Sequence, residues 1–175
     1  MSDHELIADL PDDGSRQQEV YARFGLAVYF AQVFEHGLVN VLVLSDRLAG
    51  RIVDEAAWDE RFDRLFTKTA SDLLRRLRAT GLLSPDDATL CHDAILARNR
   101  LVHHFFRVHT EDFMTTSGQQ RMVDDADSIR DLLQRADAIT ERITVGTLQS
   151  VGVDPAIIDL EAERLRQAAL ERDSE

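Results

Sequence analysis

The chain has 175 residues, 44% of them hydrophobic, and its formal net charge is −12 at pH 7. This length and composition predict one folded domain with a substantial core, and they exclude a disordered or low-complexity chain. Cys91 is the only cysteine. A single cysteine excludes a disulfide framework and is typical of a reducing cytosol, so we expect a cytoplasmic protein.

Residues 1–14 are acidic and lack the basic-then-apolar pattern of a signal peptide, so we expect a flexible N-terminal segment. Ser15 and Gln18 then match a capping box, which predicts the start of a long helix. Apolar residues continue to Leu48, and Gly50 predicts that the helix ends there.

The first predicted helix is apolar on nearly every side, which is typical of a helix at the centre of a bundle or in a dimer interface. Its stretch 24–44 is long enough to span a membrane, but Glu35 lies mid-span, where a charge is energetically expensive. We therefore expect a buried helix and no membrane association. Gly25 and Gly37 would let neighbouring helices approach closely.

Helix caps mark the next elements. Asp54 predicts the cap of a second helix, and a short basic segment separates that helix from the third. Ser84, followed by Pro85 and two aspartates, predicts the start of the third helix, because a cap, a proline and acidic residues all favour a helix N-terminus. This helix should reach about Val108.

The last third of the chain predicts a loop at 109–118, a fourth helix at 119–149 and a fifth helix that begins after Asp154. We expect the fifth helix to fray into a flexible tail at 172–175. No stretch has the alternation of a β-strand. The sequence therefore predicts an all-α fold, a bundle of about five helices forming a single domain at 15–171.

The most informative motif is Arg98-Asn99-Arg100-Leu101-Val102-His103, which lies within the third predicted helix. An arginine can neutralise a phosphate and a histidine can move a proton near neutral pH, so together they suit metal-independent cleavage of a phosphodiester. An arginine followed directly by asparagine, with a histidine four residues after the asparagine, is expected by chance only about 0.007 times in a chain of this composition.

The R-N-x-x-x-H motif of Arg98, Asn99 and His103, on a late helix of a small helical chain, resembles the HEPN superfamily (higher eukaryotes and prokaryotes nucleotide-binding). The resemblance implies a HEPN-like bundle and a metal-independent endoribonuclease of the toxin or phage-defence type, with these three residues catalytic and no cofactor. In some toxins of the family, a tyrosine two residues after the histidine is modified by a partner nucleotidyltransferase. Phe105 stands at that position here, so control by that modification is not implied.

In the implied reaction the ribose 2′-hydroxyl attacks the adjacent phosphorus, which gives a 2′,3′-cyclic phosphate and a 5′-hydroxyl. DNA would resist because it lacks the 2′-hydroxyl. His103 suits the proton transfer, and Arg98 suits the charge on the phosphoryl oxygens. Asn99 suits either the orientation of His103 or binding to the RNA backbone.

On an ideal helix Arg98 lies in the middle of an apolar stripe, and His103 lies about 140° away from it. An arginine in such a seam needs an anionic partner, and we predict that Glu35 of the first helix holds Arg98. One chain does not obviously place Arg98 and His103 around one phosphate. The resemblance implies an answer, because family members commonly dimerise and unite both motifs in one cleft. The stripe around Arg98 comprises Cys91, Ala94, Ile95, Leu101, Val102 and Phe105.

Positive charge is concentrated in residues 61–110, whose net charge is +4, whereas the remaining residues sum to −16. Two interpretations stay open, ordinary solvated helix faces or a basic path for RNA beside the motif. The candidate RNA-binding residues are Arg75, Arg76, Arg78, Arg100 and Arg107. The expected partners are thus RNA, a second copy of the chain and a cognate antitoxin.

Other kinds of site find little support. The histidines lack metal-ligand spacing, so we expect no metal site. Cys91 lies on the apolar stripe and is typical of a core residue rather than a nucleophile. Two other functions stay open: a non-catalytic helical scaffold for oligomerisation or partner binding, and a nucleotide-binding regulator in which Arg98 holds a ligand phosphate.

Overall fold

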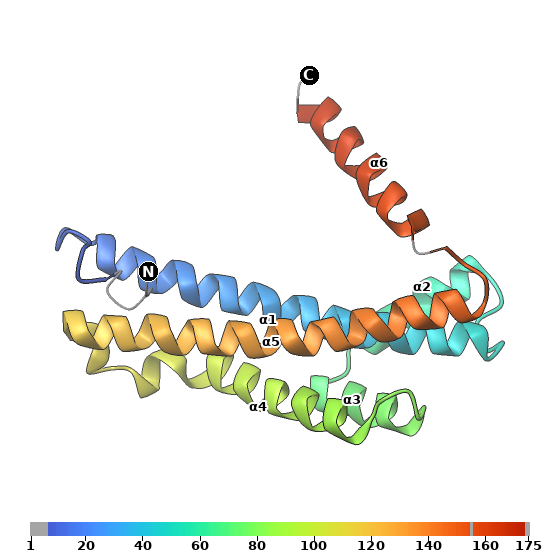
Figure 1. The fold of residues 1–175 in the computed structure, drawn as a ribbon, viewed down its shortest axis with the longest axis horizontal. Helices are drawn as coiled ribbons and strands as arrows, with labels where there is room; N and C mark the ends of the chain where they lie inside the picture. The colour runs from blue at the N-terminus through green and yellow to red at the C-terminus, as the bar shows by residue number, and fades with distance from the viewer. Residues whose placement is uncertain (1–6, 155, 174–175) are drawn as a thin grey trace.

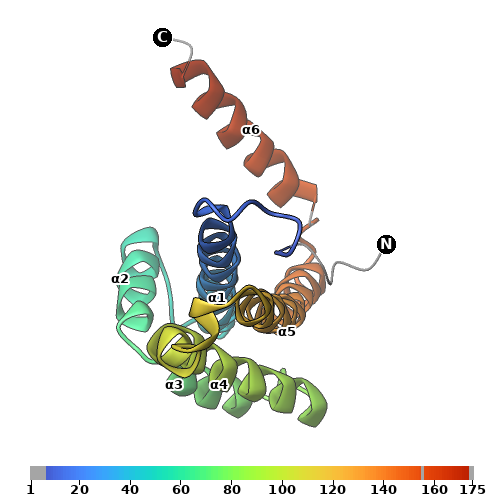
Figure 2. The ribbon, with the colours of Figure 1, turned by 90° about the vertical axis from the view of Figure 1, so that its left-hand side faces the viewer.

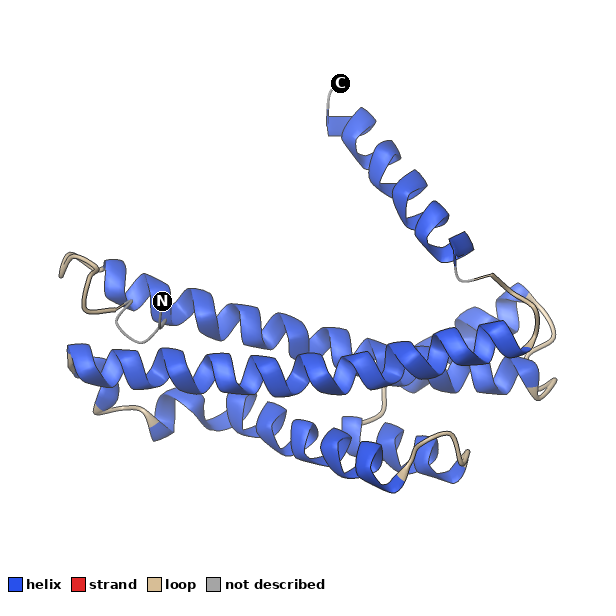
Figure 3. Ribbon diagram, viewed as in Figure 1, coloured by secondary structure: helices blue, strands red, loops and turns tan. Residues whose placement is uncertain are grey.

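The computed structural model describes residues 7–154 and 156–173, and all regular structure in these residues is helical (Figure 3). The all-α prediction is confirmed, with six α-helices in the described residues rather than five. The extra helix is the short basic segment, which is a helix of its own because the Thr69 side chain accepts a hydrogen bond from the backbone N–H of Asp72. The elements in chain order are α1 (Ser15–Leu48), α2 (Glu55–Phe66), α3 (Ala70–Ala79), α4 (Pro85–Val108), the 3-10 turn η2 (Asp112–Met114), α5 (Thr116–Ser150) and α6 (Ala156–Asp173).

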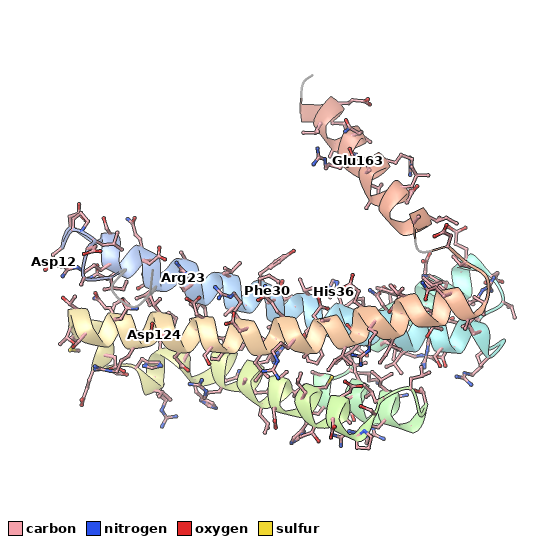
Figure 4. The ribbon with its side chains drawn as sticks, viewed as in Figure 1. Asp12, Arg23, Phe30, His36, Asp124 and Glu163 are labelled. Carbon is pink, nitrogen blue, oxygen red and sulfur yellow. The ribbon has the colours of Figure 1, made fainter. Side chains whose placement is uncertain are left out.

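Helices α1 and α5 form the centre of the bundle and run parallel, side by side, over most of their length (Figure 1). Helix α4 packs against both and runs in the opposite direction, while α2 and α3 cover another side of α1 (Figure 2). Polar contacts fix the register of the central pair. Arg23 of α1, which is labelled in Figure 4, donates from Nη1 to Asp127 of α5 at 3.1 Å.

The close packing of α1 on α5 depends on Gly37. A Cβ built on Gly37 would lie 2.1 Å from Oγ1 of Thr140, a buried residue of α5. The same construction at Gly25 meets nothing within 4 Å. The prediction of a close helix approach is therefore confirmed at Gly37 and wrong at Gly25, which faces away from the neighbouring helices.

The helix caps predicted from local sequence are confirmed at two helix starts and wrong at a third. Asp54 and Ser84 cap α2 and α4 as predicted, each accepting a hydrogen bond from a backbone N–H in the first turn. The capping box at Ser15 is wrong, because Gly14 occupies the cap position with φ 101° and the Ser15 hydroxyl donates to Asp13 instead. The predicted loop at 109–118 is shorter than expected, because Thr115 caps α5 through the N–H of Gly118.

The segment before α1 packs on the bundle from Ile7 onwards. Ile7 is fully buried, and its backbone N–H donates to Oε1 of Gln120 at 3.0 Å. The carbonyl oxygen of Leu10 accepts a hydrogen bond from Arg16. The remainder of the predicted flexible N-terminus, residues 1–6, and the last two residues of the predicted tail lie outside the described residues.

Helix α1 is long and apolar enough to cross a membrane by length and composition, with a mean hydropathy of 1.5 in its most apolar window. This is weak evidence for a span, because the core helix of a soluble protein passes the same test. The face of α1 that meets the other helices carries its buried residues, among them Phe34, Leu38 and Val39.

Helix α6 extends away from the bundle (Figure 1). Four of its large apolar side chains are more than half exposed, namely Ile157, Leu160, Leu165 and Leu170. The candidate site described next is lined by residues of α1, of the start of α3 and of α4, and by none of α6.

Candidate functional site

Three segments that are distant in the sequence meet at one pocket of about 340 Å³. Helix α4 contributes the predicted motif, α1 contributes Glu35, and the third side is the start of α3. The predicted catalytic residues and their predicted support thus share one pocket within a single chain. The lining residues are Glu35, Lys68, Thr69, Ala70, Ser71, Ile95, Arg98, Asn99 and His103.

Arg98 and Glu35 form the predicted ion pair across the interface of α4 and α1. Arg98 Nε and Glu35 Oε1 are 2.5 Å apart, and their side chains are 27% and 24% exposed. Both atoms are buried and neither has a partner in hydrogen-bond geometry, so the contact is a close ion pair rather than an aligned hydrogen bond. The predicted pairing is confirmed, and both partners line the pocket.

Asn99 acts on Arg98 rather than on His103. Its Oδ1 accepts a hydrogen bond from Arg98 Nη1 at 3.2 Å. Two contacts therefore hold the guanidinium, one from Glu35 and one from Asn99. An arginine side chain carries five N–H donors, so it has capacity for a ligand beyond these two contacts.

His103 is exposed at the rim of the pocket. Its ring lies 6.2 Å from the ring of His104, centre to centre, at an interplanar angle of 61°. Arg98 and His103 line the same pocket despite their 140° separation on the helix, and the start of α3 lines it as well. A solvent-accessible imidazole next to a fixed guanidinium suits proton transfer at a bound phosphate.

The start of α3 was not predicted as part of the site, and it adds positive potential to the pocket. Thr69, Ala70 and Ser71 line the pocket where the positive end of the helix dipole lies. Lys68, the only lysine in the chain, precedes them. The charge of Arg98 offsets that of Glu35. Lys68 and the N-terminus of α3 therefore leave the pocket favourable to an anion. The Thr-x-x-Asp cap at 69–72 was the local signal that could have revealed this helix start.

The candidate RNA-binding arginines do not gather at this pocket. Arg100 donates two hydrogen bonds to Asp125, at 2.7 and 2.6 Å, and this contact raises the pKa of Arg100 despite partial burial. Arg75 pairs with Asp72, and Arg78 donates to a backbone carbonyl of α4. Arg107 is exposed near the end of α4. Arg76 alone lies close to the site, in a neighbouring cleft with Lys68.

A second polar cluster, at the end of α4, was not anticipated. The two ring nitrogens of the buried His109 lie 2.7 Å from Asp112 and 2.9 Å from Asp125. Hydrogen bonds from His109 and Arg121 lower the pKa of Asp112. Burial acts to raise the pKa of Asp125, but hydrogen bonds from Arg100 and His109 outweigh it and the pKa is lowered. The cluster ties α4, η2 and α5 together, away from the pocket.

The remaining candidate chemistry is limited. Cys91 is buried, and burial raises the pKa of its thiol to about 11, so it is protonated at neutral pH. In the part of the chain that the structure describes, no group of three or more His, Cys, Asp or Glu side chains is placed to hold a metal ion.

Comparisons of the chain with models of known families, with characterised proteins and with solved structures gave no match.

Proposed function

We propose that the chain is a HEPN-type, metal-independent endoribonuclease of the toxin or defence-effector kind. The observation that carries the proposal is that Arg98, Asn99 and His103 line one pocket together with Lys68 and the start of α3. A guanidinium, an ammonium and a helix N-terminus all favour a phosphate there, and the imidazole lies at the rim. RNA is the substrate, a cognate antitoxin is a partner, and the cytoplasm is the compartment.

Each residue has one role in the proposed reaction. Arg98, held by Glu35 and Asn99, offsets the negative charge that develops on the phosphoryl oxygens as the 2′-hydroxyl attacks. His103 accepts the proton of the 2′-hydroxyl. The leaving 5′-oxygen must receive a proton in turn, and a His103 from a second copy of the chain supplies it.

The surface beside the motif supports the proposed homodimer. Val102 was expected in the apolar stripe, but it is 42% exposed, and Leu96 on the same helix is 54% exposed. Large apolar side chains next to a polar pocket are typical of an interface. A symmetric dimer through α4 would bring two copies of the motif towards each other.

The test is cleavage of mixed RNAs by the purified protein in EDTA. We expect cleavage products with 2′,3′-cyclic phosphate ends, and a loss of about 10²- to 10⁴-fold in His103→Ala. Arg98→Ala should lose a comparable factor. His92→Ala is the matched control, because His92 is an exposed histidine on α4 outside the pocket. Equal cleavage by His103→Ala and wild type, with both folded, would contradict the proposal.

A helical scaffold is the second candidate, and the exposed apolar side chains on α4 and α6 favour it. A scaffold would self-associate or bind a partner through these surfaces and leave RNA intact. Size-exclusion chromatography of the His103→Ala variant separates the two functions. Unchanged association together with absent cleavage in the wild type would favour the scaffold.

A further inference from the structure

A second cleft, of about 260 Å³, lies between α2 and α3 next to the candidate site. Four of its five lining residues are cationic, and no carboxylate lines it. The lining residues are Arg61, Arg64, Leu65, Lys68 and Arg76. In a chain of net charge −12, a cleft without acidic residues concentrates positive potential at one place.

Only one of the four cationic side chains in this cleft forms an ion pair, although the charge of Arg76 also helps to lower the pKa of Asp72. Arg61 is engaged, because its Nε donates to Asp46 at 2.5 Å. Arg64, Lys68 and Arg76 form no ion pair with any carboxylate that the structure describes. Arg76 Nε is buried and has no hydrogen-bond partner. A buried donor without a partner is costly, and a bound anion would satisfy it while offsetting the repulsion between the cations.

The cleft is continuous with the candidate site through Lys68, which lines both pockets. A ligand with a phosphate at Arg98 that extends past Lys68 enters the cleft directly. Only a molecule with several phosphates in a row would occupy both the pocket at Arg98 and the cleft. A nucleic-acid strand has this chemistry, whereas a lone phosphate would fill one place and leave the other empty.

We propose that the cleft of Arg64, Lys68 and Arg76 binds a backbone phosphate of the same RNA strand whose neighbouring phosphate lies at Arg98. This inference rests on the proposed function and names its substrate more closely, as a single-stranded segment held by its backbone on the side of α3. Contacts to phosphates carry no base information, so the cleft positions the strand without selecting its sequence.

The experiment measures binding of a fluorescent 2′-O-methyl oligonucleotide of about eight residues, which cannot be cleaved, by anisotropy at several salt concentrations. The test variant is the double change Arg64→Gln with Arg76→Gln. The matched control is Arg135→Gln with Arg172→Gln, which removes the same charge from α5 and α6 at exposed arginines outside the cleft. Thermal unfolding of both variants verifies that they are folded.

We expect the cleft variant to bind on the order of threefold to tenfold more weakly than wild type between about 50 and 200 mM salt. The slope of log K against log salt should fall by about 0.7 for each phosphate that the variant no longer neutralises. The control should bind within about twofold of wild type with an unchanged slope. Equal weakening in both variants, no weakening in either, or no binding by the wild type would overturn the cleft proposal.

The outcomes separate this inference from the proposed nuclease. Binding that depends on the cleft, without cleavage of unmodified RNA, would support the cleft proposal and contradict the nuclease proposal. Cleavage that depends on His103, with equal binding by the cleft variant and the control, would support the nuclease proposal and contradict the cleft proposal.

Discussion

Glu35 of α1 and Arg98 of α4 meet across the helix interface with Oε1 and Nε only 2.5 Å apart. Glu35→Gln keeps the shape of the side chain but leaves the half-buried guanidinium without its counter-charge. We expect a loss of about 1–2 kcal/mol in the free energy of unfolding, measured with urea, together with reduced RNA cleavage. Glu141→Gln, at an exposed position within α5, is the control. If Glu35→Gln matches wild type in both assays, the pair supports neither the fold nor the site.

Gly37 and Gly25 offer a matched pair on one helix. In Gly37→Ala the new Cβ collides with Thr140, so we expect a loss of about 1–3 kcal/mol in unfolding free energy. Gly25→Ala adds a methyl group in open space and should stabilise the protein by up to about 1 kcal/mol through helix propensity. Chemical denaturation of the two variants measures the difference. A similar stability for both would mean that α1 and α5 are not in close contact at Gly37.

The cluster around His109 predicts a dependence of stability on acid. The pKa values of Asp112 and Asp125 are lowered in the folded state, so both carboxylates contribute stability above the unfolded value of about 3.9. This contribution is lost as the pH falls through the lowered folded values. We expect the urea midpoint of the wild type to drop steeply below about pH 4.

Asp125→Asn isolates this effect, because the amide does not titrate. Its stability should be lower than that of wild type at pH 7 and should change less between pH 5 and pH 3. Asp131→Asn, an exposed position on α5, controls for the general change in charge. Parallel pH profiles for wild type and Asp125→Asn would show that the cluster does not contribute to acid sensitivity.

Cys91 should be unreactive in the folded protein. It is fully buried, and its pKa is raised to about 11, so the reactive thiolate is scarce at pH 7. We expect negligible labelling by a thiol reagent in native buffer and complete labelling in denaturing guanidinium chloride. Rapid labelling of the native protein would place Cys91 at an accessible position.

Local chemistry explains what the sequence could predict. Asp54 and Ser84 cap their helices because a cap needs only a side-chain oxygen and an N–H two or three residues later. The partner of Arg98 was predictable because an arginine on an apolar stripe requires an anion, and Glu35 lies on a similar stripe of α1. At Ser15 the local signal failed, because Gly14 reaches a positive φ that other residues rarely adopt and takes over the cap.

Contacts between distant segments explain what the sequence could not predict. The pocket depends on the start of α3 lying beside α4, and no periodicity within either helix indicates that neighbour. The cluster around His109 likewise joins Asp112 of η2 to Asp125 of α5. Arg76 forms no ion pair with a described carboxylate. Which arginines form ion pairs is decided only when the helices pack.

Lys68 is the only lysine in the chain, and it lies where the pocket and the cleft join. Apart from the terminal amine, amine-directed acylation therefore has one target among the side chains. A dye attached there would stand on the surface where the strand is proposed to run. Protection of that single amine by an added oligonucleotide would map occupancy by mass spectrometry without any engineered label.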